Sequence, residues 1–238
     1  MSDVGKKREF NQDSFYYKKL NEEKCLAFVC DGMGGVKGGG IASNLVKELF
    51  CRKIPKHLEK VCSIEDIKNL IFDCYEEAND FIFRRSLADE SLKGMGTTCI
   101  TTVIYKNCLM VFNVGDSRVY VKFNDVFKQL TVDHSYVQTL VDCGKITKEQ
   151  AKFHPRKNEI TKAVGITKNI NIDFQTFNVE KDSFILLCTD GLTNSCSDEQ
   201  IANIIECEED VLNGVKRLVE VANFNGGYDN ITAVLIEI

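Results

Sequence analysis

TTCITTVIYKNCLMVFNVGDSRVYVKF, residues 97–123, is the stretch that decides the fold class of this chain. It contains three apolar, β-branched segments with only short polar breaks between them: Thr97–Tyr105, Cys108–Val114 and Arg118–Phe123. Breaks this short join antiparallel strands, whereas parallel strands need a long crossover connection. The stretch therefore predicts an antiparallel meander.

Helices and strands are grouped in the rest of the chain, which favours an α+β fold. Apolar runs predict strands at Lys24–Cys30, Ile170–Val179, Ser183–Thr189 and Ile231–Ile238, and periodic segments predict helices at Gly38–Phe50, Ser63–Arg85, Asp198–Ile205 and Val211–Asn223. Strict strand–helix–strand alternation is absent, so we expect mostly antiparallel sheets rather than a doubly wound one. With two prolines and no low-complexity linker, residues 1–238 are predicted to form one domain. Residues 134–165 are polar and broken, and are expected to leave the core with one or two short helices.

The two long helices are each predicted to bury one apolar face. Ser63 is the expected N-cap of the second helix, with Asp66 three residues later. The predicted apolar stripes are Ile41, Leu45, Val46 and Leu49 in the first helix, and Ile67, Leu70, Ile71, Cys74, Ala78 and Phe81 in the second.

Composition places the chain among ordinary globular proteins. Its hydrophobic content is 44%, its charged content 27% and its net charge −5, which disfavours nucleic acid as the main partner because phosphate binding needs a concentrated basic surface. The sequence contains no run of 18 apolar residues, so we expect no membrane span. Most of the eleven cysteines lie in apolar runs and no CxxC pair occurs, so we expect reduced, structural thiols in a cytoplasmic protein.

Four aspartates end apolar runs beside a small or flexible residue. They are Asp31 in LAFVCDGMGG, Asp116 in MVFNVGDSR, Asp190 in FILLCTDGLTN and Asp229 in GGYDNIT. A buried strand that ends in an unpaired carboxylate is costly unless a positive charge meets it. Oxygen ligands of this kind suit hard divalent cations such as Mg²⁺ or Mn²⁺. Each motif alone is also compatible with a turn, but four together favour a metal site.

Several other chemistries lack their sequence motifs. The glycines from Gly32 to Gly40 match neither a P-loop nor a dinucleotide-binding turn. No cysteine has an arginine six residues later, and no Asp-x-Asp or Gly-x-Ser-x-Gly occurs. The remaining chemistry is attack by a metal-activated water. Arg8 is a candidate phosphate-binding residue, because its planar guanidinium group can donate two hydrogen bonds to two phosphate oxygens. His134 and His154 are weaker candidates for proton transfer.

Eight motifs in this order resemble the metal-dependent protein phosphatases of the 2C type, almost from end to end. They are SDVG-x-x-R-x-x-NQD (Ser2–Asp13), VCDGMGG (Val29–Gly35), GMGTT (Gly94–Thr98), NVGDSRVY (Asn113–Tyr120), DHS (Asp133–Ser135), ITKAVG (Ile160–Gly165), CTDGLTN (Cys188–Asn194) and DNIT (Asp229–Thr232). The resemblance implies a four-layer αββα sandwich of two antiparallel sheets flanked by helices. Residues 134–165 match the mobile flap of this family.

The resemblance also assigns roles to individual residues of a centre with two Mn²⁺ or Mg²⁺ ions. Asp31 would bridge both ions and the Gly32 carbonyl would bind one of them. Asp190 and Asp229 would complete the protein ligands of the other ion. Arg8 would hold the substrate phosphate, and Asp116 would help to bind a third, weaker metal.

Three positions depart from the family pattern. Many eukaryotic members have a histidine, the proposed general acid, where this chain has Met33, and methionine together with the short chain resembles the bacterial branch. Without that histidine, water or His134 would protonate the leaving group. Gln12 stands where the family often has glutamate, and Asn194 where some relatives have aspartate.

The expected function is hydrolysis of phosphoserine and phosphothreonine in proteins by a metal-activated water. The alternatives are a catalytically inactive scaffold and a hydrolase for another phosphate ester. Phosphorylated proteins are the expected partners, among them a Ser/Thr kinase of the same cell, with no nucleic acid and no membrane. The family expectation is a monomer.

Overall fold

Two antiparallel sheets packed face to face form the centre of the computed structural model of this chain, which describes residues 1–238 apart from the Val36 side chain. One sheet has the order β1 (Ser2–Asp3), β11 (Ile231–Glu237), β10 (Phe184–Cys188), β7 (Arg118–Phe123) and β8 (Val126–Gln129). The other has the order β2 (Asp13–Asn21), β3 (Lys24–Met33), β5 (Cys99–Tyr105), β6 (Cys108–Val114) and β9 (Asp173–Asn178), with β4 (Gly96–Thr97) paired to β3.

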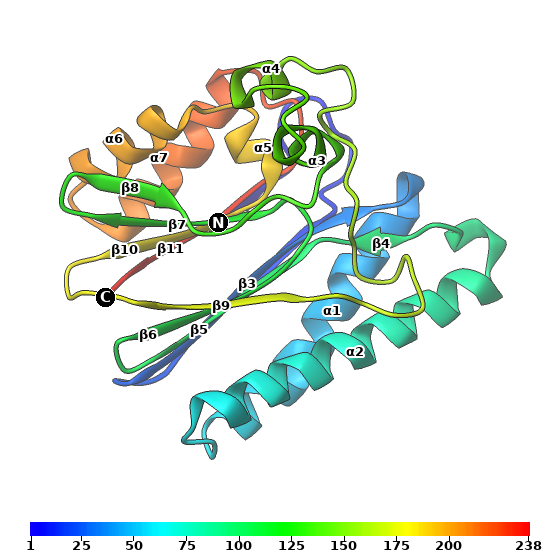
Figure 1. The fold of residues 1–238 in the computed structure, drawn as a ribbon, viewed down its shortest axis with the longest axis horizontal. Coiled ribbons are helices and arrows are strands. Elements are labelled where there is room, and N and C mark those ends of the chain that lie inside the picture. Colours follow the sequence, from blue (N-terminus) through cyan, green and yellow to red (C-terminus); the bar gives the residue numbers. More distant parts are fainter.

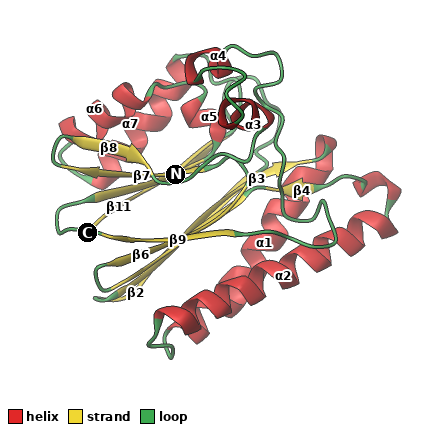
Figure 2. Cartoon of the chain, in the orientation of Figure 1, coloured by secondary structure: helices red, strands yellow, loops and turns green.

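Helices cover the outer faces of both sheets. The helices are α1 (Gly35–Leu58), α2 (Ile64–Ala88), α3 (Tyr136–Asp142), α4 (Lys148–Lys152), α5 (Asp190–Thr193), α6 (Asp198–Cys207) and α7 (Val211–Phe224), with a short 3-10 helix at Glu90–Leu92, and α1, α2, α6 and α7 are the ones that lie along the sheets (Figure 1). Figure 1 shows α1 and α2 along one sheet and α6 and α7 along the other, and Figure 2 shows the strands enclosed between them. The predicted αββα sandwich is confirmed. No helix among the described residues combines the length and apolar composition needed to cross a membrane.

The strand β3 carries an uninterrupted apolar run, Cys25–Cys30, because both of its faces are buried there. Leu26, Phe28 and Cys30 pack toward α1 and α2, whereas Ala27 and Val29 pack between the two sheets. Alternate side chains of a strand point to opposite faces, so one uninterrupted apolar run serves both layers. The eleven cysteines are all unpaired thiols in the described residues, in line with the sequence prediction.

The predicted meander over residues 97–123 is wrong at its last connection. β5 and β6 pair, but β6 then pairs with β9, and β7 pairs with β10 and β8 in the opposite sheet. The break at residues 115–117 is therefore a crossing between sheets, and Gly115 adopts a φ of 117° there. This crossing places Asp116 at the end of the sandwich, where the two sheets meet.

The helix α1 begins and ends beyond the predicted bounds, and of its predicted apolar stripe Val46 is fully buried while Ile41, Leu45 and Leu49 pack partly buried against the core. Ala42, Val46 and Phe50 are fully buried, whereas Ile41 and Leu45 are only half-buried. The buried side chains follow an i, i+4 row, and the predicted stripe was centred one residue away from it. The flank of α1 that carries Ile41 and Leu45 is consequently left partly open to solvent.

The cap of α2 is confirmed, because the Ser63 side chain accepts a hydrogen bond from the Asp66 amide at 3.1 Å. Phe81 was wrongly included in its buried stripe: it is 48% exposed, and Ile82 is buried instead. The strands β2 and β8 and the helix α5 had no sequence prediction. The short helices α3 and α4 lie in the polar segment 134–165, as predicted.

Candidate active site

All six residues proposed from the sequence line one pocket of about 790 Å³. The lining comprises Arg8, Glu9, Phe10, Gln12, Asp31, Gly32, Met33, Gly34, Gly35, Thr98, Asp116, Asn158, Glu159, Ile160, Asp190, Asp229 and Asn230. These residues come from the N-terminal loop, the ends of β3 and β10, the crossing after β6, the segment 134–165 and the turn before β11. The fold thus brings together carboxylates that are up to 198 residues apart in sequence.

Asp31 and Gly32 lie near the end of β3, where the backbone is crowded. The Asp31 amide donates to Thr98 Oγ1 at 2.9 Å, and the Thr98 amide donates to the Asp31 carbonyl at 2.8 Å. A Cβ on Gly32 would lie 2.2 Å from the Gly39 carbonyl oxygen and 2.7 Å from that of Gln12. Only glycine allows α1 and the N-terminal loop to approach this closely, which fixes Asp31 at the pocket.

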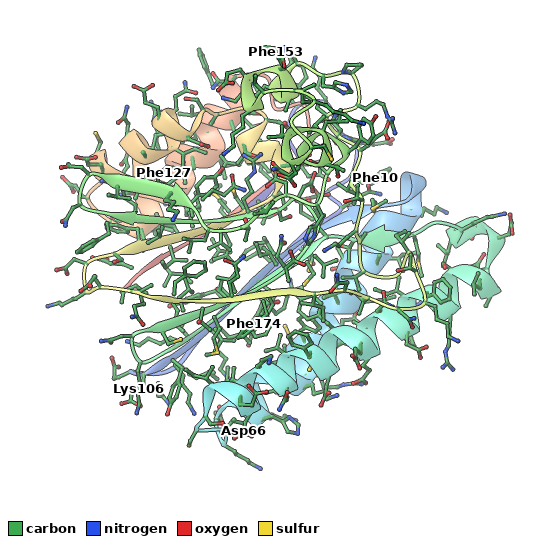
Figure 3. All side chains as sticks on the ribbon, viewed as in Figure 1. Phe10, Asp66, Lys106, Phe127, Phe153 and Phe174 are labelled. Carbon is green, nitrogen blue, oxygen red and sulfur yellow. The ribbon has the colours of Figure 1, made fainter. Side chains whose placement is uncertain are left out.

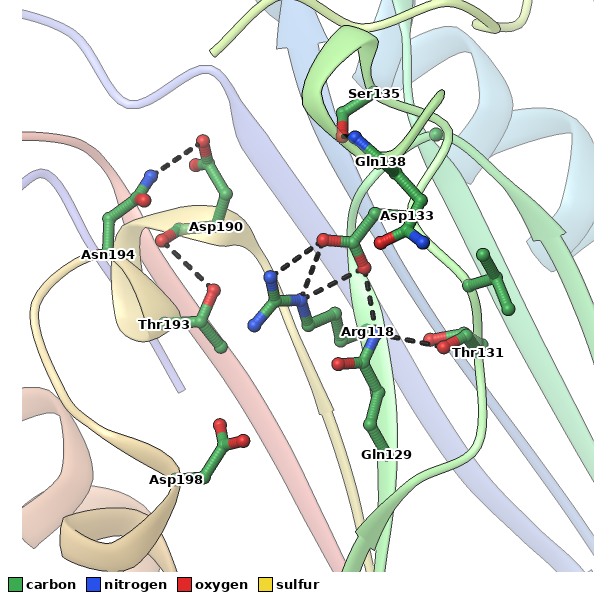
Figure 4. Close-up of polar contacts among 12 residues, drawn as sticks. Arg118, Gln129, Thr131, Asp133, Ser135, Gln138, Asp190, Thr193, Asn194 and Asp198 are labelled. Carbon is green, nitrogen blue, oxygen red and sulfur yellow. Dashed lines mark hydrogen bonds and ion pairs between the residues drawn. The ribbon is translucent and has the colours of Figure 1, made fainter. Parts of the chain in front are cut away.

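Asp190 begins the short helix α5, directly after the buried strand β10. Asn194 Nδ2 donates to Asp190 Oδ2 at 3.0 Å, whereas Oδ1 is buried and has no hydrogen-bond partner in the described residues (Figure 4). A Cβ on Gly191 would lie 1.9 Å from the Asn230 carbonyl oxygen. This close approach sets Asp190 beside Asp229.

Arg8 lies on an exposed loop and pairs with Asp229, with 2.8 Å between Arg8 Nη2 and Asp229 Oδ2. Asn230 holds this loop in place: its Nδ2 donates to the carbonyls of Val4 and Phe10 at 2.9 and 3.0 Å, and its Oδ1 accepts from the Gln12 amide at 2.8 Å. Sequence reasoning quoted Asn230 in the DNIT motif without giving it a role.

Arg118 is a second cation near the carboxylates, and sequence reasoning missed it. Its guanidinium binds Asp133 through Nε at 3.0 Å and Nη2 at 2.7 Å (Figure 4), and Nη1 donates to Tyr120 at 3.0 Å. The charge of Arg118 acts to lower the pKa values of Asp116 and Asp190. The GDSR motif contained this residue, but only the structure shows its partner.

Burial and mutual repulsion raise the pKa values of the carboxyl groups around the pocket. The pKa of Asp31 is raised by burial and then by the charges of Asp13 and Asp190, and that of Asp190 by burial and then by Asp229. Burial raises the pKa of Asp116 to about 8, and that of Asp13, beneath the pocket, to about 7. The site therefore concentrates negative charge that the nearby arginines only partly offset.

The residues present fit a divalent cation. The partnerless Asp190 Oδ1 and the clustered carboxyls are hard oxygen donors in need of positive charge. In the described residues, however, no three Asp, Glu, His or Cys side chains are already gathered into a ligand set. Asp229 faces Arg8 and Asp190 faces Asn194, so an ion has to compete with these two contacts.

The histidines take no part in the pocket lining. His134 is buried, where its Nδ1 accepts from the Gly115 amide at 3.0 Å and its Nε2 lies 3.0 Å from Asp173. It therefore braces the crossing that carries Asp116 and is not placed to protonate a leaving group. His154 packs near Tyr136, with 5.9 Å between the ring centroids.

The stability of the metal-free protein is expected to fall as pH rises from about 4 to about 8. The folded chain keeps protons on Asp13 and Asp116 up to about pH 7 and 8, whereas the unfolded chain loses them near pH 4. The folded state thus binds more protons across this window, and Asp13 alone contributes a loss on the order of a few kcal/mol. Urea unfolding in chelator at pH 5, 6.5 and 8 measures this, and Asp116→Asn should flatten the slope. A midpoint that rises with pH would contradict it.

Comparison with known proteins agrees with this geometry over nearly the whole chain. The Protein phosphatase 2C family matches residues 5–228. The serine/threonine phosphatase stp of Listeria innocua is 33% identical over 236 residues, which cover 99% of this chain and 93% of the relative. The solved serine/threonine phosphatase of S. agalactiae has a TM-score of 0.91 at 31% identity, with 100% and 98% of the two chains covered.

A further solved structure bears on the chemistry of the pocket. The catalytic domain of the serine/threonine protein phosphatase PstP, in complex with two manganese ions, has a TM-score of 0.86 at 32% identity, with 100% of this chain and 95% of that chain covered. Matches of this identity and coverage show the family as well as the fold. This chain therefore belongs to the protein phosphatase 2C family, as a bacterial-type serine/threonine protein phosphatase.

Proposed function

We propose that this chain hydrolyses phosphoserine and phosphothreonine in proteins at the pocket that holds Arg8 and the four aspartates. The convergence of Asp31, Asp116, Asp190 and Asp229 on one pocket with a single exposed arginine at its mouth is the observation that carries the proposal. A hydrolase for another phosphate ester would share this pocket, but the relatives favour protein substrates. The inactive scaffold has no supporting observation, because the proposed ligand aspartates are all present.

The proposed cofactors are two Mn²⁺ or Mg²⁺ ions, in line with the two manganese ions of the PstP structure. Asp31 and the Gly32 carbonyl would hold one ion, Asp31, Asp190 and Asp229 the other, and Asp116 would help to hold a third, weaker one. When bound, such ions supply a water of lowered pKa as the nucleophile and offset charge on the phosphoryl oxygens.

The side chains of this protein then bind and orient the substrate. Arg8 is exposed at the pocket mouth, so its guanidinium can turn from Asp229 to two phosphate oxygens. Because Met33 has no exchangeable proton and His134 is buried elsewhere, the leaving alkoxide takes its proton from water. Asn158, Glu159 and Ile160 of the segment 134–165 line the same pocket, which supports a flap role for this segment.

The remaining assignments are proposals on the same basis. Residues 1–238 act as one catalytic domain and as a monomer, with phosphorylated proteins as substrates, among them a Ser/Thr kinase of the same cell. The unpaired thiols support a reducing compartment such as the cytoplasm.

Phosphate release from a phosphothreonine peptide tests the proposal. We expect Mn²⁺ to support turnover and excess chelator to lower it by at least about a hundredfold, because the nucleophile depends on the ions. A small aryl phosphate, assayed in parallel, distinguishes loss of peptide binding from loss of chemistry. A folded sample that releases no phosphate from either substrate with Mn²⁺ would overturn the phosphatase assignment.

A further inference from the structure

A second pocket of about 570 Å³ adjoins the candidate active site and has no role in the chemistry described above. It is lined by Phe10, Asn11, Gln12, Lys37, Gly40, Ile41, Asn44, Leu45, Glu48 and Arg85. We call it the α1 groove, because most of its wall is the flank of α1. Phe10 and Gln12 line both this groove and the active-site pocket, so the two lie on either side of these residues.

The α1 groove combines apolar side chains with two cations, Lys37 and Arg85, and one anion, Glu48. Phe10 is 53% exposed beside the start of α1 (Figure 3), and Ile41 and Leu45 lie half-buried on the flank of α1. Lys37 and Arg85 are exposed, and within the described residues their side chains form no hydrogen bond or ion pair. An apolar surface beside unpaired cations suits a ligand that has an apolar and an acidic group close together.

The loop segment Phe10–Gln12 forms a ridge between the two pockets and is held rigidly. Asn230 Nδ2 donates to the Phe10 carbonyl at 3.0 Å, and Gln12 Nε2 donates to the Gly35 carbonyl at 3.0 Å. The ridge is thus tied both to the turn before β11 and to the start of α1. A preformed wall of this kind lowers the ordering cost of binding.

We infer that the α1 groove binds the polypeptide segment that flanks the phosphorylated residue of the substrate. The inference rests on the proposed function and names the kind of sequence that function favours. An extended chain advances about 3.3 Å per residue, so residues close to the phosphoresidue held at Arg8 pass over Phe10 into the groove. An apolar side chain packs against Phe10, Ile41 and Leu45, and an acidic one lies near Lys37 and Arg85.

Charge changes at the rim test this inference without disturbing the core. Arg85→Glu is expected to raise the KM for a phosphothreonine peptide with flanking leucine and glutamate about five- to tenfold, and Glu48→Lys to lower it. Neither change should affect the KM or kcat for a small aryl phosphate, which does not reach the groove. Arg84→Glu is the matched control, because Arg84 adjoins Arg85 in sequence but pairs with Asp80 and does not line the groove.

The peptide supplies the complementary variants. Each flank of the phosphothreonine is varied separately, with glutamate replaced by lysine or leucine by serine. We expect the KM of the wild type to rise only when the changed residue is on the flank that enters the groove. The difference between wild type and Arg85→Glu should shrink in 0.5 M salt, because exposed charges are then screened.

Three outcomes would overturn the inference. Equal effects of Arg84→Glu and Arg85→Glu would show a general charge effect, and equal effects on the aryl phosphate would place the change in the active-site pocket. A change in the molar mass in solution on Arg85→Glu would identify the groove as a contact between copies of this chain. Fluorescence anisotropy of a labelled phosphopeptide in chelator measures peptide binding without turnover. If the wild type proved inactive, the proposed function would be contradicted, but this binding measurement would still test the groove.

Discussion

Replacing Asp190 by asparagine is expected to lower phosphatase activity at least about 10³-fold while leaving the metal-free protein as stable as the wild type or more so. Activity falls because the amide removes a negative charge from the proposed metal centre. Stability is kept because the pKa of Asp190 is raised in the folded protein by burial and by the charge of Asp229, so its ionised form costs folding free energy. Catalytic need and folding stability oppose each other at this residue.

Two measurements separate these effects. Phosphate release with Mn²⁺ gives the loss of turnover, and thermal unfolding at pH 8 in chelator and in Mn²⁺ gives the stability of both forms. The rise in Tm on addition of Mn²⁺ should be smaller in the variant than in the wild type. A ligand raises Tm in proportion to how tightly it binds the folded state, and the variant should bind Mn²⁺ more weakly. Asp73→Asn, at an exposed position on α2 away from the pocket, is the control. Near-normal turnover in Asp190→Asn would remove Asp190 from the metal centre.

Replacing Arg118 by methionine is expected to destabilise the protein by about 3–5 kcal/mol, the usual cost of removing one partner from a buried ion pair. The side chains of Arg118 and Asp133 are only 27% and 14% exposed, and the guanidinium contacts both carboxylate oxygens. Without Arg118, Asp133 keeps only the hydrogen bond from Gln129 Nε2 at 2.8 Å. Urea unfolding at pH 7 measures the loss.

The double variant Arg118→Met/Asp133→Leu should recover much of this loss, because no unpaired buried charge then remains. Arg84→Met is the control: it breaks the exposed pair with Asp80 and should barely change stability. A double variant less stable than Arg118→Met would show that the carboxylate of Asp133 has a role beyond its pairing with Arg118.

Much of the fold could be predicted from sequence because burial leaves a local record. The run Cys25–Cys30 is apolar at every position because both faces of β3 are buried, and the Ser63 cap depends on contacts within one turn. The strands recognised in this way and the helices α2, α6 and α7 lie close to their predicted bounds, whereas α1 extends to Leu58 instead of ending at Phe50. The αββα layering itself came from the family resemblance, since apolar runs alone led only to α+β packing.

The sequence by itself determined that strong apolar strands end in carboxylates, and that these carboxylates need a cation. Only the tertiary structure decided that β6 and β7 belong to different sheets, because an apolar segment shows that it is buried but not which layer it joins. The same holds for the anchoring of the Arg8 loop by Asn230 and for the pairing of Arg118 with Asp133. These contacts join residues that only the packing of two sheets brings together, so no local pattern records them.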